Sequence, residues 1–334
     1  MLRITLGWLV AAAFIMLAFR RVSLGSVVVA LRNAQAVPLW IALVALAAGF
    51  TARIVRWWWM LRVLEPGLPL RECARPYLVS IAINNTVPLR VGDIVRAVGF
   101  RSTLRSSPMA VIGTLLVERL LDVLVLLVLL FAGLIALGQA VVPRPFFVGG
   151  MVIGAVATLG LLSLVLIPNV LRRIAASVLQ AIPLSETWRA RLLSLSDQFF
   201  TSLAIVRPPS RALVLLGMTV IAWGLEGSAY ACVAWSLRAA GSPFAPWFAL
   251  STGTLATMIP SSPGYVGTFD YFAVRGLTAF GADHVIALSF ALLTHMLLWL
   301  PVTLVGALYL VLPGARRVRD AAPASPVASA KSAA

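Results

Sequence analysis

Nine ionisable side chains lie inside long apolar stretches of this sequence. They are Arg53, Arg56, Glu118, Arg119, Asp122, Glu226, Asp270, Arg275 and His295. A single Arg or Asp at the centre of a membrane helix costs roughly 2.5–3.5 kcal/mol, so such residues are paired with one another or serve a function. With a neutral His295, the basic and acidic groups of the set balance. Two interpretations stay open: a site for a polar substrate, or an ion network that holds helices together. The same residues can do both.

The spacing of these residues indicates which of them act together. Glu118 and Asp122 are four residues apart, which places both carboxylates on one face of a helix. Arg53 and Arg56 are about one turn apart and precede three consecutive tryptophans. A guanidinium fork matches phosphate oxygens, so this pair predicts contact with an anionic headgroup, although Arg56 can also extend towards the membrane surface. Arginines and carboxylates together in apolar surroundings favour an amphiphile over an inorganic ion.

The composition identifies the environment of these charges. Of 334 residues, 61% are hydrophobic and 11% are charged, against about 25% charged residues in soluble domains. The chain is therefore expected to be an all-α polytopic membrane protein. The net charge of +16 is attributed to orientation in the bilayer, and no nucleic acid partner is expected. Two cysteines, far apart, and two histidines predict no disulfide framework and no metal site, and no cofactor is expected.

Six stretches are long enough to cross a membrane, for which about 20 apolar residues are needed. These predicted spans are residues 4–20, 38–60, 110–137, 146–168, 211–237 and 284–312. A cleavable signal peptide at residues 4–19 is disfavoured, because the nearest small-residue triplet lies too far beyond the apolar run.

Two further apolar stretches, residues 77–100 and 247–280, are interrupted in the middle. The interruptions contain Pro88 and Gly92 in the first stretch, and Pro260, Pro263 and Gly264 in the second. Proline removes a helical hydrogen bond, and irregular backbone at membrane depth is tolerated only where protein or a wet cavity surrounds it. Both stretches are therefore predicted to be re-entrant helical hairpins. Arg90 lies at the tip of the first, beside free backbone N–H groups that favour an anion.

The two interruptions resemble each other. The shift that places Pro88 on Pro260 also places Gly92 on Gly264. Each interrupted stretch follows two predicted spans and precedes one, and three spans per half force the second half to start from the opposite side. This arrangement predicts an inverted repeat with a transport site between its halves.

The distribution of basic residues predicts the orientation. With the N-terminus inside, eighteen Lys and Arg residues lie in cytoplasmic segments and five in outer loops. Because cytoplasmic loops are rich in Lys and Arg, both termini are expected in the cytoplasm of a multi-pass inner-membrane protein. The first hairpin then opens to the cytoplasm and the second to the outside.

The expected domain organisation is simple. Residues 1–315 form one transmembrane domain, with inverted halves of about 1–140 and 141–315. Residues 169–206 carry an apolar stripe at helical spacing next to arginines, which predicts an amphipathic helix on the cytoplasmic leaflet. Residues 316–334 are rich in Ala, Ser and Pro and are expected to be a disordered cytoplasmic tail.

Four motifs in this order resemble the flippase-like transmembrane domain of lysylphosphatidylglycerol synthases and the stand-alone proteins built from it. The Arg-x-x-Arg-Trp motif is Arg53, Arg56 and Trp57. The Asn…Pro-x-Arg-x-Gly-acid-x-x-Arg motif is Asn84, Pro88, Arg90, Gly92, Asp93 and Arg96. The Glu-Arg-x-x-Asp motif is Glu118, Arg119 and Asp122, and the Pro-x-x-Pro-Gly-x-x-Gly motif is Pro260, Pro263, Gly264 and Gly267.

The resemblance implies a lipid flippase or lipid transporter of the bacterial inner membrane. Its substrate would be a phospholipid, glycolipid or hopanoid-type amphiphile. The predicted binding residues are the charged and amide residues of these motifs and two further intramembrane acids: Arg53, Arg56, Asn84, Arg90, Asp93, Arg96, Glu118, Arg119, Asp122, Glu226 and Asp270. The sequence departs from the family pattern at Asp93, Tyr265 and Asp270, which affects the choice of lipid. An aminoacyl-transferase domain is not found, so the chain is not expected to be an enzyme. The alternative is an accessory subunit or membrane enzyme of a glycolipid or hopanoid pathway, which could associate with a lipid-synthesis enzyme.

Overall fold

The computed structural model describes residues 12–19, 22–87, 90–138, 144–183, 185–202, 209–239, 241–259 and 262–311. These residues form helices and connecting turns, with no strand among them. Four helices are long and apolar enough to cross a membrane. They are α3 (Ala36–Leu61), α7 (Pro108–Leu137), α11 (Pro209–Ser236) and α14 (His284–Val311). Each coincides within two residues with a predicted span, so the chain is a multi-pass membrane protein.

The ends of α7 show why these boundaries can be read from sequence. Ser107 precedes the helix, and its Oγ accepts a hydrogen bond from the N–H of Ala110. Pro108 occupies the first turn, where its missing N–H costs nothing. Gly138 follows the last turn with a φ of 67°, a left-handed conformation that glycine adopts without a steric penalty.

The two remaining predicted spans are not among these four helices. Within residues 4–20 the structure describes a helix over Ala12–Phe19, bent by 76° from α2 (Leu24–Arg32). If this bent pair crosses as one span, the described residues contain up to five crossings. The predicted span at 146–168 is helix α8 (Arg144–Leu166).

The outward faces of the long helices are apolar. Val44, Val128, Val220 and Leu304 are each more than half exposed. A soluble protein rarely exposes apolar surface on such a scale, so these faces are suited to contact lipid chains.

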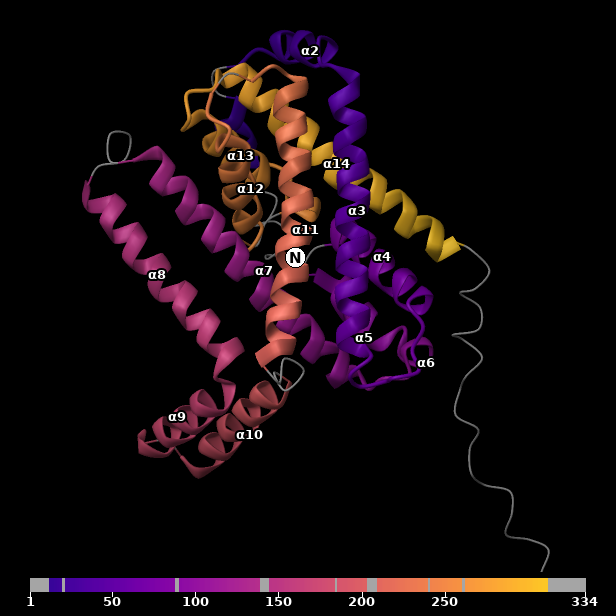
Figure 1. The fold of residues 1–334 in the computed structure, drawn as a ribbon, viewed down its shortest axis with the longest axis vertical. Coiled ribbons are helices and arrows are strands. Elements are labelled where there is room, and N and C mark those ends of the chain that lie inside the picture. Colours follow the sequence, from indigo (N-terminus) through magenta and orange to yellow (C-terminus); the bar gives the residue numbers. More distant parts are fainter. Residues whose placement is uncertain are drawn as a thin grey trace, which may run out of the picture.

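Both interrupted stretches fold as two short helices around a break (Figure 1). The first broken pair is α4 (Arg71–Thr86) and α5 (Val91–Val98), and the second is α12 (Ala245–Ala256) and α13 (Thr268–Thr278). None of these helices has the roughly 20 residues that a crossing requires. Pro88 and Pro260, predicted to cause the breaks, lie outside the described residues.

Each broken pair begins and ends at the same end of the molecule. The first lies between the end of α3 and the start of α7, followed by the short α6 (Arg101–Leu104), and the second between the end of α11 and the start of α14 (Figure 1). These two ends of the molecule are opposite. Along the middle, α3 packs against α11, while α4 packs against α14 and α12 against α7. Each broken pair therefore contacts the last long helix of the other half.

The segment 169–206 contains two helices where the sequence predicted one. Helices α9 (Pro168–Ala181) and α10 (Glu186–Ser202) pack against each other at the end of the molecule opposite α2 (Figure 1). Pro183 explains the interruption, because proline forces the preceding residue out of helical geometry, and Ile182 is extended with a ψ of 135°. The predicted tail, residues 316–334, lies outside the described residues.

Candidate functional site

A cavity of about 230 Å³ lies between the two breaks. We call it the central cavity. Its wall includes eight of the predicted binding residues, which come from five different helices: Arg53, Asn84, Asp93, Arg96, Glu118, Arg119, Asp122 and Glu226. Of the other three predicted binding residues, Arg56 lies behind this wall, Arg90 lines a neighbouring cavity, and Asp270 contacts a wall residue.

Arg56 is fully buried and joins three helices. Its Nη1 donates to Asp122 Oδ1 at 2.7 Å and to Thr219 Oγ1 at 2.7 Å, and its Nη2 lies 3.2 Å from Glu118 Oε1. It lines neither cavity described here. Arg56 therefore orients the two carboxylates from behind the cavity wall.

The Glu118 carboxylate contacts three polar side chains. Besides Arg56, it accepts from Tyr77 Oη at 3.0 Å and from Arg96 Nη2 at 3.0 Å. The Arg96 guanidinium lies 3.7 Å from the centre of the Trp57 ring, a cation–π arrangement. This cluster fastens α5 to α7 and to the end of α3, so the first broken pair is held by charge as well as by apolar packing.

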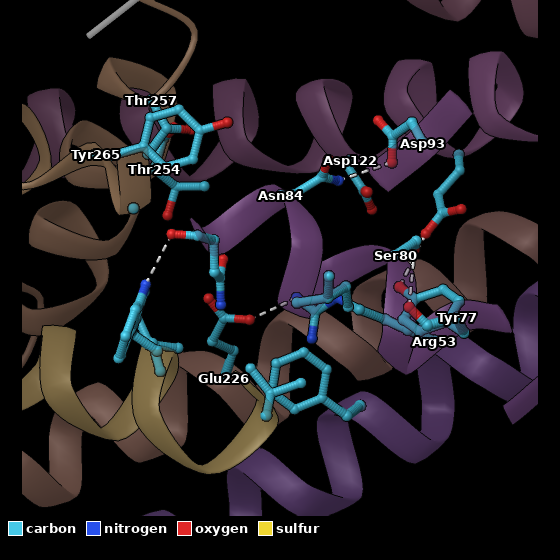
Figure 2. Close-up of a pocket in the computed structure, with 18 of the residues that line it drawn as sticks. Arg53, Tyr77, Ser80, Asn84, Asp93, Asp122, Glu226, Thr254, Thr257 and Tyr265 are labelled. Carbon is cyan, nitrogen blue, oxygen red and sulfur yellow. Dashed lines mark hydrogen bonds and ion pairs between the residues drawn. The ribbon is translucent and has the colours of Figure 1, made fainter. Parts of the chain in front are cut away.

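Arg53 forms a second ion pair, one helical turn from Arg56. Its Nη2 lies 2.6 Å from Glu226 Oε2 on α11, and Figure 2 shows the two side chains facing each other in the cavity. The guanidinium also lies 4.7 Å from the centre of the Trp223 ring. Arg53 and Glu226 are both about nine-tenths buried.

A third set of polar contacts in the cavity wall joins Asn84, Asp93 and Arg119. Asn84 donates to Asp93 Oδ1 at 2.9 Å (Figure 2), while Asp93 Oδ2 lies 3.4 Å from Arg119 Nη2. The Arg119 side chain keeps 45% of its surface exposed. Of the arginines that line the central cavity, Arg119 is the one with the longest ion pair.

Arg90 lies at the break of the first pair, directly before α5, in a left-handed conformation with a φ of 53°. Its Nε donates to Tyr265 Oη at 3.1 Å, so the two breaks touch. Within the described residues, no carboxylate lies in ion-pair range of Arg90. Arg90 and Arg119 both line a side cavity of about 260 Å³, whose other walls include Val123, Leu126 and Met258.

Asp270 belongs to the second break. Its Oδ2 accepts from the N–H of Gly267 at 2.8 Å, and its Oδ1 lies 2.8 Å from His295 Nδ1. His295 Nε2 lies 2.9 Å from the carbonyl oxygen of Gly264. His295 lines the central cavity, whereas Arg275, at the far end of α13, is exposed.

Two glycines in the breaks have distinct roles. A Cβ on Gly92 would lie 1.9 Å from the Ser80 carbonyl oxygen, so this glycine lets α5 approach α4. Gly264 has a φ of 67°, and a Cβ there would lie 2.8 Å from Trp299 Nε1. Pro263 opens the short helix Pro263–Tyr265, and Gly267, with a φ of 85°, precedes α13.

The wall also contains residues that were missing from the predicted binding set, among them Tyr77, Trp223, Tyr265, His295 and Trp299. His295 had a signal, because it is ionisable in an apolar helix. Tyr265 was noted as a departure from the family pattern. Tyr77, Trp223 and Trp299 had no signal, since aromatic side chains are common throughout membrane helices and only the folded structure shows which face inward. Within the described ranges, no group of three or more His, Cys, Asp and Glu side chains could hold a metal ion.

The fold and the site together define a class: a helical membrane protein with a charged, aromatic-walled cavity between two interrupted helix pairs. Residues 4–306 match the family described as the lysylphosphatidylglycerol synthase TM region. The chain belongs to this family, as its motifs indicated. A search of the curated proteins found no match.

Proposed function

We propose that the protein moves a lipid with an anionic headgroup between the leaflets of the bacterial inner membrane. In this proposal the two broken pairs are re-entrant hairpins entering from opposite sides, the halves form an inverted repeat of six spans, and both termini are cytoplasmic. The lipid is a phospholipid, glycolipid or hopanoid-type amphiphile. Membership of a family named for a lipid synthase's membrane region supports a lipid substrate.

The observation that carries the proposal is the position of Arg90 and Arg119. Arg90 has no ion-pair partner among the described residues, and Arg119 has only a long contact to Asp93. Both face a side cavity that also has an apolar wall. Guanidinium groups bind phosphate oxygens through paired hydrogen bonds, while the apolar wall suits an acyl chain. An amphiphile satisfies both surfaces at once.

The contact pattern supports the inverted repeat. Arg96 on α5 pairs with Glu118 on α7, and Asp270 on α13 pairs with His295 on α14. In both halves, the second helix of the broken pair is thus tied to the long helix that follows it. Interrupted helices in corresponding positions of two halves are typical of transporters with midplane sites.

The alternative, a membrane enzyme, is less well supported by the carboxylates. Glu118 and Asp122, on one face of α7, are the carboxylates that such an enzyme would use as acid and base, yet arginine side chains bind both. A general acid or base must reach the proton it transfers, and these carboxylates are already occupied. An accessory role beside a lipid-synthesis enzyme remains compatible with the lipid-binding site proposed here.

The test uses purified protein in liposomes that contain fluorescent phosphatidylglycerol. A quencher that cannot cross the membrane reports how fast labelled lipid appears in the outer leaflet. Hydrogen bonds to charged groups contribute about 1.5–3 kcal/mol, so Arg90→Gln is expected to slow this movement by roughly tenfold to a hundredfold.

Arg105→Gln is the matched control. Arg105 also has a left-handed backbone, with a φ of 52°, but it is exposed and lines neither cavity. Glutamine is therefore equally strained at both positions, and only Arg90→Gln removes a charge from the side cavity. The proposal is wrong if protein-free liposomes move the lipid as fast as the wild type, or if both variants slow movement equally. The same assay with fluorescent phosphatidylcholine tests for a preference for the anionic headgroup, because this lipid should then move more slowly than phosphatidylglycerol.

A further inference from the structure

The ring of His295 lies between two hydrogen-bond acceptors. A carbonyl oxygen can only accept, so His295 Nε2, at 2.9 Å from the Gly264 carbonyl, carries a hydrogen. Asp270 accepts from the N–H of Gly267 with one oxygen and faces His295 Nδ1 with the other. An ionised carboxylate is acceptor-only, so Nδ1 also carries a hydrogen. With these contacts, the His295–Asp270 pair carries one proton more than a neutral histidine beside an ionised aspartate.

We propose that His295 and Asp270 form a proton-binding site in the wall of the central cavity, and that its proton fastens the second break to α14. The inference deepens the proposed function, on which its role in transport rests. The His295 side chain is 15% exposed and lines the cavity, so water there can deliver and remove the proton. No covalent bond forms or breaks, apart from the N–H bond of the ring.

Loss of the proton leaves one of the two acceptors without a donor. If the remaining hydrogen stays on Nδ1, the Gly264 carbonyl is released from α14. Gly264 is followed directly by Tyr265, and both have left-handed backbones, with φ values of 67° and 59°. Tyr265 Oη accepts from Arg90. Protonation of His295 is therefore connected to the place where the two breaks meet by two hydrogen bonds and the peptide bond between Gly264 and Tyr265.

The other charges around His295 are already matched. On α13, Asp270 is its partner, while Arg275 is exposed at the far end. From α11, Glu226 lines the same cavity but pairs with Arg53 on α3. On α4, the residues that line the cavity are uncharged, and the charged residue of α2, Arg32, lies in its last turn outside the cavity. Across the cavity, Arg96 and Glu118 pair with each other and Arg119 with Asp93, while Asp122 pairs with Arg56. The charge of His295 therefore depends mainly on Asp270.

The protonation state can be observed directly, because the chain has two histidines. Nuclear magnetic resonance of protein containing isotope-labelled histidine distinguishes rings with one and two hydrogens, and His284→Gln assigns the signals. In neutral buffer, His295 is expected to carry two hydrogens in the wild type and one in Asp270→Asn, where the asparagine amide donates to Nδ1. If the wild-type His295 ring carries one hydrogen in neutral buffer, the proposal is wrong, whether or not lipid moves.

The role in transport is tested in the liposome assay with a pH difference across the membrane. The double variant His295→Gln/Asp270→Asn provides a neutral replacement. Its glutamine amide can donate to the Gly264 carbonyl and accept from the introduced asparagine, whose own oxygen can accept from the N–H of Gly267. Wild type and His284→Gln are expected to change rate severalfold when the pH difference is reversed, and the double variant is expected to lose this response.

The possible failures can be told apart. A double variant that keeps the wild-type response overturns the role of this proton. A wild type that moves lipid but ignores the pH difference does the same. If the wild type moves no lipid under any condition, the proposed function is wrong, while the resonance experiment still decides whether the proton site exists.

Discussion

Replacing Arg56 with methionine is expected to lower the free energy of unfolding by about 3–5 kcal/mol, the range for removing one partner of a buried ion pair. Arg56 is completely buried, and its guanidinium contacts both Glu118 and Asp122. Methionine fills most of the space but leaves Asp122 with Trp223 as its remaining donor. Thermal unfolding of the detergent-solubilised protein, followed by tryptophan fluorescence, measures the loss.

Arg172→Met is the matched control for this prediction. Arg172 on α9 pairs with Asp197 on α10, and both side chains are about half exposed. Exposed ion pairs contribute about 0–1 kcal/mol, so the same change of residue type is expected to have little effect there. Equal losses in the two variants would show that Arg56 does not stabilise the bundle through its buried carboxylates.

Gly92→Ala is the second substitution for which we expect a large effect. The added methyl group would lie 1.9 Å from the Ser80 carbonyl oxygen and 2.7 Å from Asn84 Oδ1. Both neighbours belong to α4, and the first is backbone, which cannot rotate away. Overpacking typically costs about 1–3 kcal/mol and occasionally more. We expect a value at the upper end, together with slower lipid movement, because separating α5 from α4 also displaces Arg90 and Asp93.

Gly217→Ala separates this steric effect from the general effect of adding a methyl group to a helix. Gly217 lies in α11, is exposed, and has no atom within 4 Å of the added Cβ. Alanine in a helix interior is about 0.5–1 kcal/mol more favourable than glycine, so this variant is expected to be at least as stable as the wild type. A Gly92→Ala protein with wild-type melting behaviour and transport would contradict the close approach of α4 and α5.

The long helices could be predicted because their signal is local. A run of about 20 apolar residues must be helical in a membrane, since every backbone polar group needs a partner. The ends of α7 followed from Ser107, Pro108 and Gly138 in the same way. The interruption between α9 and α10 also has a local cause in Pro183, although the prediction for residues 169–206 did not use it.

The pairing of the charges could not be predicted. Sequence shows that Arg53 and Arg56 need partners, but Glu226 is 173 residues from the first, and Asp122 is 66 from the second. These partners, far apart in the sequence, come together only when α3 packs against α11 and α7. Nor does the sequence distinguish Arg56, behind the cavity, from Arg53, in its wall, because that difference depends on less than one turn of helix rotation.

The positions of these ion pairs also have a consequence for biosynthesis. Helix α3 carries both Arg53 and Arg56, whereas their carboxylate partners belong to α7 and α11, which the ribosome makes later. Until those helices emerge, α3 holds two arginines without these partners, each costing roughly 2.5–3.5 kcal/mol in the bilayer. Arg56 gains its partners when α7 completes the N-terminal half, whereas the ion pair of Arg53 with Glu226 can form only after α11 of the C-terminal half has been made.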